Sequence, residues 1–202
     1  MESALVISDS DEDAAFFSVM LKAASIRNVT CLKSVDDARK LLIKQDFDLI
    51  IVNMPNNNEF GEGFSRYAAS KGITQVILLV ESKFFDTVSS ACEADGVITI
   101  SKPMDKALFW SAILLAKSLK NRLKRMQDEN TQLRQKIEDI RIIDRAKCLL
   151  ISMMKMSEQE SHRYIEKQAM DIRSTRRIVA EGILKRYDNY EGAEDRKDYA
   201  AG

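Results

Sequence analysis

The sequence predicts an α/β domain with a doubly wound parallel sheet, followed by one long helix and a C-terminal three-helix module. Residues 3–110 alternate five short apolar runs with five amphipathic segments, which is typical of repeated strand–helix units. Residues 107–156 contain neither proline nor glycine, so nothing interrupts a helix there. Beyond them, two further amphipathic segments each begin at a residue that caps helices.

Each element of the first domain has its own signal. Residues 50–52 form a continuous apolar run, as expected for a central strand covered by helices on both faces. Ser34 should cap the second helix, Gly72 and Gly96 should end the third and fourth, and the fifth should start after Asp105. The expected strands are ALVIS (4–8), VTCLKS (29–34), FDLIIVN (47–53), QVILLVE (75–81) and VITIS (97–101).

The third strand ends in Asn53, at the edge of the sheet where doubly wound folds place their chemistry. Pro55 and three asparagines then predict a sharp turn. An amide neither ionises nor acts as a nucleophile, so this edge lacks a reactive group at its central position. Two interpretations of Asn53 remain open. It either bonds nearby backbone as a turn residue, or its amide contacts a ligand or partner.

Apolar residues recur along the long helix at alternating intervals of four and three, the pattern of a coiled-coil seam. The alternative is a long helix packed on its own domain, which the polar flanks disfavour. A solvated helix of this length needs a partner, and one asparagine on the seam favours a parallel two-stranded coil. We therefore predict a homodimer through Leu119, Leu123, Met126, Asn130, Leu133, Ile137 and Ile140.

The C-terminal module should contain two capped helices after the coil. Ser157 and Glu160 match a capping box, and Ser174 or Thr175 caps the second helix. The apolar residues expected to form its core are Ile165, Ala169, Ile178, Val179, Ile183 and Leu184, against Cys148, Leu149, Ile151 and Met154 of the coil end.

The chain's net charge of zero hides a segregation of charge: −5 over residues 1–110, +8 over 111–187 and −3 over 188–202. A basic segment joined to an acidic domain predicts an anionic partner for that segment alone. We divide the chain into an α/β domain (1–110), a dimerisation helix (111–142), a helical module (143–187) and an acidic tail (188–202) expected to be disordered.

Several function classes are disfavoured. No apolar run approaches the ~20 residues of a membrane span, and the start lacks the basic region of a signal peptide. Three scattered cysteines suggest a reducing compartment, so we expect a cytoplasmic protein. With a lone His162 and no paired thiols, no metal or cofactor is expected. Without a nucleophile beside a base or a phosphate loop, no catalytic residues and no enzyme are expected.

The runs LIIVNMP and ITISKP, with the strand–helix alternation, resemble a response-regulator receiver domain over residues 3–118. That family is phosphorylated on an aspartate after the third strand, assisted by an acidic pair, a hydroxyl, a lysine and Mg²⁺. The corresponding positions here are Ser8 and Asp9 for the pair, Asn53 for the acceptor, Val80 for the hydroxyl and Lys102 for the lysine. The family's switch aromatic falls near Thr99.

Only Asp9 and Lys102 followed by Pro103 keep the receiver pattern. The resemblance therefore implies a pseudo-receiver that is not phosphorylated and is controlled by a sensor protein or a small ligand. Within it, Lys102 is interpreted as a relic that bonds Asp9 or Asn53.

The run IIDRAKCLLISMMKMSEQESHRYIEKQAMDIRSTRRIVAEGIL resembles the ANTAR domain, an RNA-binding module of bacterial antiterminators, over residues 141–187. The resemblance implies a dimer that binds paired stem-loops in leader transcripts and so prevents terminator formation. Helix N-termini favour phosphate, and loop bases stack on aromatic or guanidinium planes. The expected RNA-binding residues are Arg145, Lys147, Tyr164, Lys167, Arg173, Arg176 and Arg177.

Two alternatives remain. The run EKQAMDIRSTRRIVAEGI also fits a DNA-binding helix–turn–helix, with Arg176 and Arg177 at the start of the recognition helix. The chain could instead be a dimeric scaffold whose first domain senses a protein or a ligand.

Overall fold

The computed structural model describes the backbone of residues 1–53 and 59–198, and the side chains of residues 1–53 and 61–187. The chain divides into two compact units, Met1–Gln127 and Asp128–Gly202. The turn expected at Pro55 and the three asparagines lies outside the described residues.

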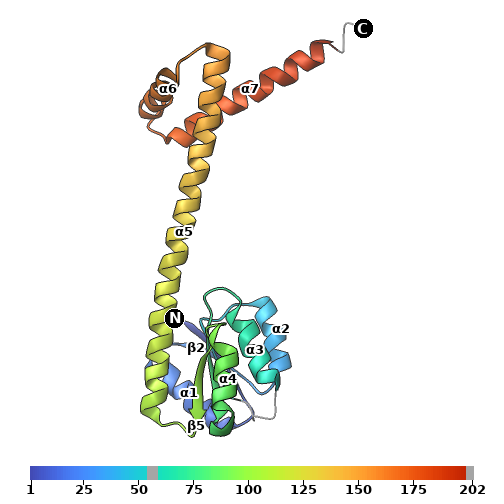
Figure 1. Cartoon of the computed structure of the whole chain (residues 1–202), viewed down its shortest axis with the longest axis vertical. Coiled ribbons are helices and arrows are strands. Elements are labelled where there is room, and N and C mark those ends of the chain that lie inside the picture. The colour runs from blue at the N-terminus through green and yellow to red at the C-terminus, as the bar shows by residue number, and fades with distance from the viewer. Residues whose placement is uncertain (54–58, 199–202) are drawn as a thin grey trace. The chain divides into compact units, whose positions relative to one another are not determined.

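The first unit contains a five-stranded parallel sheet of order β2-β1-β3-β4-β5. Figure 1 shows this sheet with helices beside it. Neighbouring strands pair in register, with Ser8 beside Asn53 and Glu81 beside Lys102. The order reverses at β1, as in doubly wound folds, so the predicted fold class is confirmed. The strands are β1 (Ser3–Ser8), β2 (Asn28–Leu32), β3 (Leu49–Asn53), β4 (Gln75–Glu81) and β5 (Ile98–Lys102).

Helices cover both faces of the sheet. On one face, Phe17 of α1 (Asp11–Ala23) and Phe109 of α5 (Lys106–Met154) pack on alternate strand residues such as Val6 and Ile51. On the other face, α2, α3 and α4 pack on the strand residues between them. Ser10 and Ser34 cap α1 and α2 with their hydroxyl groups, and Gly72 and Gly96 have positive φ angles beyond α3 and α4. The helices are α1 (Asp11–Ala23), α2 (Val35–Lys44), α3 (Glu59–Ala69), the 3₁₀ turn η1 (Ser82–Phe84) and α4 (Phe85–Glu93).

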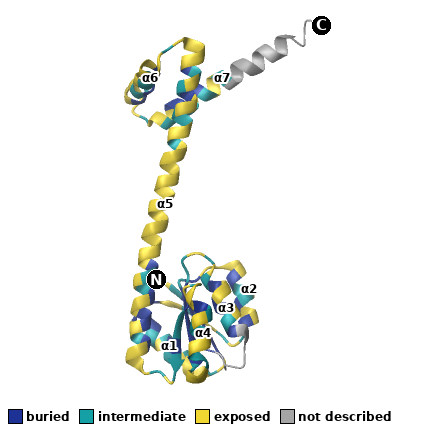
Figure 2. Ribbon diagram, in the orientation of Figure 1, coloured by how far each residue is buried: buried dark blue, intermediate teal, exposed yellow. Residues whose placement is uncertain are grey.

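Helix α5 runs unbroken from Lys106 to Met154 and takes part in both units. Its first turns pack on the sheet through Phe109, Ile113 and Ala116. Its middle carries exposed residues over many turns (Figure 2). The predicted domain boundaries at residues 110 and 142 both fall inside this one helix. No break in secondary structure marks either boundary, and both remain predictions.

The second unit joins the end of α5 to α6 (Glu158–Asp171) and α7 (Arg176–Asp198). Ser157 and Glu160 form the expected capping box, and the Thr175 hydroxyl accepts from the Ile178 N–H. The core contains Ile165, Ala169, Val179 and Ile183 as expected. On α5, however, the buried residues are Ala146 and Leu150, whereas Cys148, Ile151, Met154 and, on α7, Ile178 are exposed.

The expectation of a disordered tail from residue 188 is not met up to Asp198, because α7 continues to that residue. No proline follows residue 103, and Glu, Ala, Arg and Lys favour helix. Extending a formed helix needs no new nucleus, so such a segment continues as helix more readily than it would start one. Residues 199–202 lie outside the described part.

Among the described residues, no helix is long and apolar enough to cross a membrane.

A partly buried ion pair joins α5 to the first strand and the start of β3. The Lys120 ammonium donates to the Asp48 carboxylate, which also accepts from the backbone N–H groups of Glu2 and Ser3. Burial alone would raise the pKa of Asp48, but these hydrogen bonds lower it from 3.8 to about 2. The pair therefore fixes where α5 leaves the sheet.

Asp48→Asn is expected to reduce the free energy of unfolding of the first unit by about 1–2 kcal/mol at pH 7, because Lys120 loses its charged partner. Folding lowers the pKa of Asp48 from 3.8 to about 2, so the ionised carboxylate stabilises the folded wild-type protein. This stabilisation is complete above pH 3.8, the unfolded pKa, and is lost as pH falls toward 2. Urea unfolding at pH 7 and pH 3, followed by the fluorescence of the single tryptophan, measures both effects.

The control is Asp11→Asn, whose pair with Lys33 is exposed, with side chains 81% and 66% accessible. That substitution should change stability by less than about 0.5 kcal/mol. Equal losses in the two variants would contradict the role given to Asp48.

Candidate functional site

The carboxyl edge of the sheet holds Asn53 in a fixed position. Its side chain is buried, and the Nδ2 group donates to the Asp13 carboxylate at 2.9 Å and to the Ser8 hydroxyl at 3.1 Å. Ser8 is the strand neighbour of Asn53, whereas Asp13 comes from the first turn of α1. The amide thus bonds side chains of two other elements rather than the turn backbone that one interpretation expected.

The other receiver-like positions are dispersed around this edge. Asp9 is exposed, and Val80 is buried within β4. The hydroxyl that follows β4, on Ser82, bonds the Ser101 hydroxyl at 2.9 Å and the Lys102 carbonyl at 2.6 Å, so it ties β4 to β5. No described hydrogen bond joins the Lys102 ammonium to Asp9 or Asn53, the two partners expected for it.

The residues at this edge do not fit the magnesium ion that receivers use. The Asn53 Nδ2 group points at Asp13 and Ser8, so one side of the site is occupied by a donor that repels a cation. Across the described residues, no cluster of three or more His, Cys, Asp or Glu side chains could hold a metal. Hard cations need several converging oxygen ligands.

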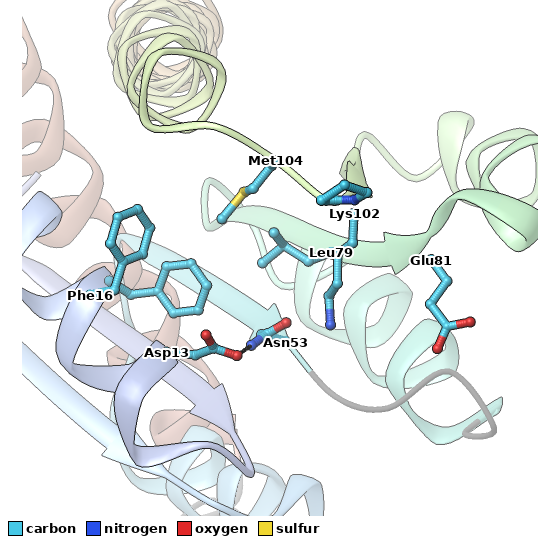
Figure 3. A pocket seen from close by; sticks show the side chains of 9 residues that line it. Asp13, Phe16, Asn53, Leu79, Glu81, Lys102 and Met104 are labelled. Atoms are coloured by element: carbon cyan, nitrogen blue, oxygen red, sulfur yellow. Dashed lines mark hydrogen bonds between the residues drawn. The ribbon is translucent and has the colours of Figure 1, made fainter.

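Beside Asn53 lies a cavity of about 600 Å³ between α1 and the segment that follows β5 (Figure 3). Sequence reasoning placed Asn53 and Lys102 at this edge but missed Asp13 and Glu81. The acidic run around Asp13 was the available signal, since a carboxylate one turn into α1 can reach the end of β3. The lining residues are Asp13, Phe16, Phe17, Asn53, Leu79, Glu81, Lys102, Pro103 and Met104.

In the second unit, three of the expected RNA-binding residues are paired with carboxylates. Lys147 bridges Asp144 at 2.8 Å and Glu158 at 3.2 Å, which raises its pKa. Arg177 donates to Asp139 at 2.7 Å and to Glu181 at 2.8 Å, and its pKa is raised likewise.

Arg176 bonds Glu166 at 3.1 Å across the α6–α7 turn. Together with the pairs of Lys147 and Arg177, this contact ties the three helices together. These three cations therefore have a structural role in the module.

The remaining expected cations have no ion pair among the described residues. Arg145 borders a cavity of about 520 Å³ on α5, and Lys167 and Arg173 are exposed. Sequence reasoning missed Arg163, which is exposed one helical turn before Lys167 and opposite the buried face of α6. Tyr164 is only half-buried, packed against the module core.

Arg173 has an unusual backbone conformation. Its φ angle is 50°, in the left-handed region that favours glycine. The Ser174 N–H bonds the Ala169 carbonyl at 2.9 Å, and the Arg173 N–H bonds the Met170 carbonyl at 3.1 Å. This is the Schellman pattern that ends a helix, with arginine in the glycine position. A large exposed side chain is thus held at the turn between α6 and α7.

Comparison with known proteins identifies a family that matches the second unit and relatives that match most of the chain. The ANTAR domain family matches residues 131–184. The transcriptional regulatory protein PdtaR of Mycobacterium tuberculosis (strain CDC 1551 / Oshkosh) is 30% identical over 144 residues, which cover 71% of this chain and 69% of PdtaR. The aliphatic amidase regulator of Pseudomonas aeruginosa is 23% identical over 137 residues, covering 68% of this chain and 70% of that protein.

Among solved structures, a response regulator receiver domain protein from Clostridium thermocellum superposes with a TM-score of 0.51 and 17% identity, over 62% of this chain and 99% of that one. At this identity the likeness shows the fold alone, which is the receiver-like α/β fold of the first unit. Both relatives named above are regulators by name. The identity to PdtaR over most of both chains, together with the ANTAR match, shows that the chain belongs to the ANTAR-domain transcriptional regulators.

Proposed function

We propose that this protein is an RNA-binding antitermination regulator, which as a dimer stabilises paired stem-loops in a leader transcript. Holding that form of the RNA shifts the population away from the competing terminator hairpin, and no covalent step is needed. Membership of the ANTAR-domain regulators supports this function. The observation that carries it is Arg173, an exposed guanidinium held at the turn between α6 and α7 in a conformation that favours glycine.

The conformation of Arg173 has an energetic cost. A non-glycine residue in the left-handed region costs roughly 1–2 kcal/mol relative to a relaxed backbone. Such costs concentrate at functional sites, where a side chain serves another purpose. Contact with an RNA phosphate or a loop base is the purpose we assign to Arg173. Arg145, Lys167 and Arg163 are further cations of this module that form no ion pair with another described side chain.

Lys147, Arg176 and Arg177 are paired with carboxylates, so we do not expect them to contact RNA directly. This pairing also disfavours DNA binding through a helix–turn–helix, because Arg176 and Arg177 at the start of α7 bond Glu166, Asp139 and Glu181. A recognition helix needs such side chains free to reach base edges.

Dimerisation through α5 is supported by the exposure of the seam. Burial of these side chains in a second copy would remove apolar surface from water, at roughly 25 cal/mol per Å². Asn130 is exposed too, as expected for a polar residue that sets register in a coil. Leu119 is half-buried, and the rest of the seam is exposed: Leu123 40%, Met126 55%, Leu133 58%, Ile137 52% and Ile140 57%.

Control through the first unit is proposed to work without phosphorylation, through a ligand or a sensor protein. Asn53 stands at the acceptor position and its amide is bonded to Asp13 and Ser8, so it offers no nucleophile.

Arg173→Gly is expected to raise stability by about 1 kcal/mol while lowering affinity for an RNA with two adjacent stem-loops about tenfold. Loss of one phosphate contact should also reduce the slope of log affinity against log salt by roughly 0.7–0.9. Thermal unfolding and RNA binding across a salt series give the two readouts. Arg173→Gln is compared with Arg186→Gln, which removes the same charge from another exposed arginine of the module. We assign Arg186 to solubility, so only Arg173→Gln should weaken RNA binding.

If Arg173→Gly bound RNA as tightly as the wild type, Arg173 would be excluded from the interface. Equal or tighter binding to a DNA duplex of the same length would support the DNA-binding alternative instead.

Ile137→Glu is expected to convert the dimer to a monomer, because it places like charges opposite each other on the coil seam. Light scattering after gel filtration measures the mass of the full chain. Ile43→Glu on α2 is the control, since Ile43 is 76% exposed but lies off the seam. A dimer that survives Ile137→Glu would assign the interface to another surface.

Acetyl phosphate is expected to leave the mass of the full-length protein unchanged, because Asn53 cannot accept a phosphoryl group. Intact-mass spectrometry, with a phosphorylatable receiver treated in parallel, is the measurement. A gain of one phosphoryl group on this chain would refute phosphate-independent control.

A further inference from the structure

The cavity beside Asn53 has no task in RNA binding or dimerisation. It is lined from α1, β3, β4, β5 and the segment after β5, all within the first unit. Its volume of about 600 Å³ lies within the range of roughly 300–1,000 Å³ usual for small-molecule sites. Its polar and apolar walls are distinct, so the chemistry of an occupant can be argued from them.

The polar wall carries one cation, Lys102, and two carboxylates, those of Asp13 and Glu81. The Asp13 carboxylate accepts from Asn53 at 2.9 Å, and Glu81 pairs with Lys83 at 2.8 Å. The Lys102 side chain is directed into the cavity toward Asn53 and Asp13 (Figure 3). Within the described part of the chain, Lys102 forms no ion pair. An anionic group on an occupant would therefore find its partner at Lys102.

The apolar wall is preorganised by ring packing. The Phe16 and Phe17 rings lie edge to face with centroids 5.5 Å apart, and Phe17 packs against Phe109 with centroids at 5.0 Å. Leu79 and Met104 complete this side of the cavity. Rings held in this way offer a flat or aromatic group a surface that needs little reordering on binding.

We propose that this cavity binds a small organic anion, with a carboxylate at Lys102 and an apolar, preferably aromatic, body against Phe16, Leu79 and Met104. The inference deepens the proposed control of the first unit, and rests on the proposal that this unit does not accept a phosphoryl group. The carboxylates of Asp13 and Glu81 would bar ligands of higher negative charge. An inorganic phosphate ion would leave the apolar wall unfilled.

The test uses the full-length protein with ¹³C-labelled methionine methyl groups, and Met104→Leu to assign the Met104 signal. The probes are phenylacetate, the neutral 2-phenylacetamide, the cationic phenethylamine and inorganic phosphate. We expect phenylacetate to shift the Met104 signal saturably, and to bind about tenfold tighter than phenylacetamide, which corresponds to ~1.4 kcal/mol. Phenethylamine and phosphate should bind more weakly still.

Two variants locate the contacts. Lys102→Gln should remove the preference for phenylacetate over phenylacetamide, while Phe16→Ala should weaken both probes together. Lys44→Gln is the matched control, because Lys44 is an exposed lysine at the end of α2 and lies outside the lining. It should leave the preference in place.

The proposal is overturned if no probe saturates the Met104 signal, if phenethylamine binds best, or if Lys102→Gln retains the carboxylate preference. Phosphate binding as tightly as phenylacetate would make the cavity a plain anion site, and would also overturn it. Phosphoryl transfer from acetyl phosphate is measured separately by mass, so failure of the ligand site and failure of phosphate-independent control give different results.

Discussion

The apolar stripe along the middle of α5 is the main constraint on how this chain can be stable. Helix α5 (Lys106–Met154) packs its first turns against the sheet and buries Ala146 and Leu150 in the three-helix module. Between these two regions Met126, Leu133 and Ile137 are exposed. A helix stabilised along its middle by local interactions alone would be marginal. In the proposed dimer, a second α5 would cover that stretch. Such a dimer would bring two ANTAR modules to one RNA, as the proposed binding of paired stem-loops requires.

The first unit keeps a receiver-like architecture, with the non-ionisable Asn53 at the end of its central strand β3. Asn53 occupies the position at which chemistry would be expected, but its amide is bonded to Asp13 and Ser8. Lys102 and a cavity of about 600 Å³ lie beside Asn53, and we propose that this edge recognises a ligand instead of transferring a phosphoryl group. Asp48 and Lys120 hold α5 at the opposite, amino end of β3, so the helix that carries the proposed dimer seam is anchored to the same sheet.

Sequence reasoning recovered the elements because their signals are local. Alternation of apolar runs, the Ser157–Glu160 box and the glycines after α3 and α4 each act within a few residues. Partners distant in sequence were missed: Asp13 for Asn53, and Asp139 for Arg177. The sequence predicted the wrong face of α5 for the module core: Ala146 and Leu150 are buried, whereas Cys148 and Ile151 are exposed. Apolar residues occur on several faces of this helix, so their spacing alone does not identify the buried face. The count of charges in the sequence predicted a basic module. Which of its cations form ion pairs with carboxylates became clear only from the structure.

The most direct test of the account is the affinity of the full-length protein for an RNA with two adjacent stem-loops, compared with the same RNA lacking one loop. A dimer that places one ANTAR module on each loop predicts a strong preference for the two-loop RNA, and loss of that preference when the α5 seam is broken by Ile137→Glu. Equal affinity for the one-loop RNA, or a preference that survives in the monomer, would contradict it.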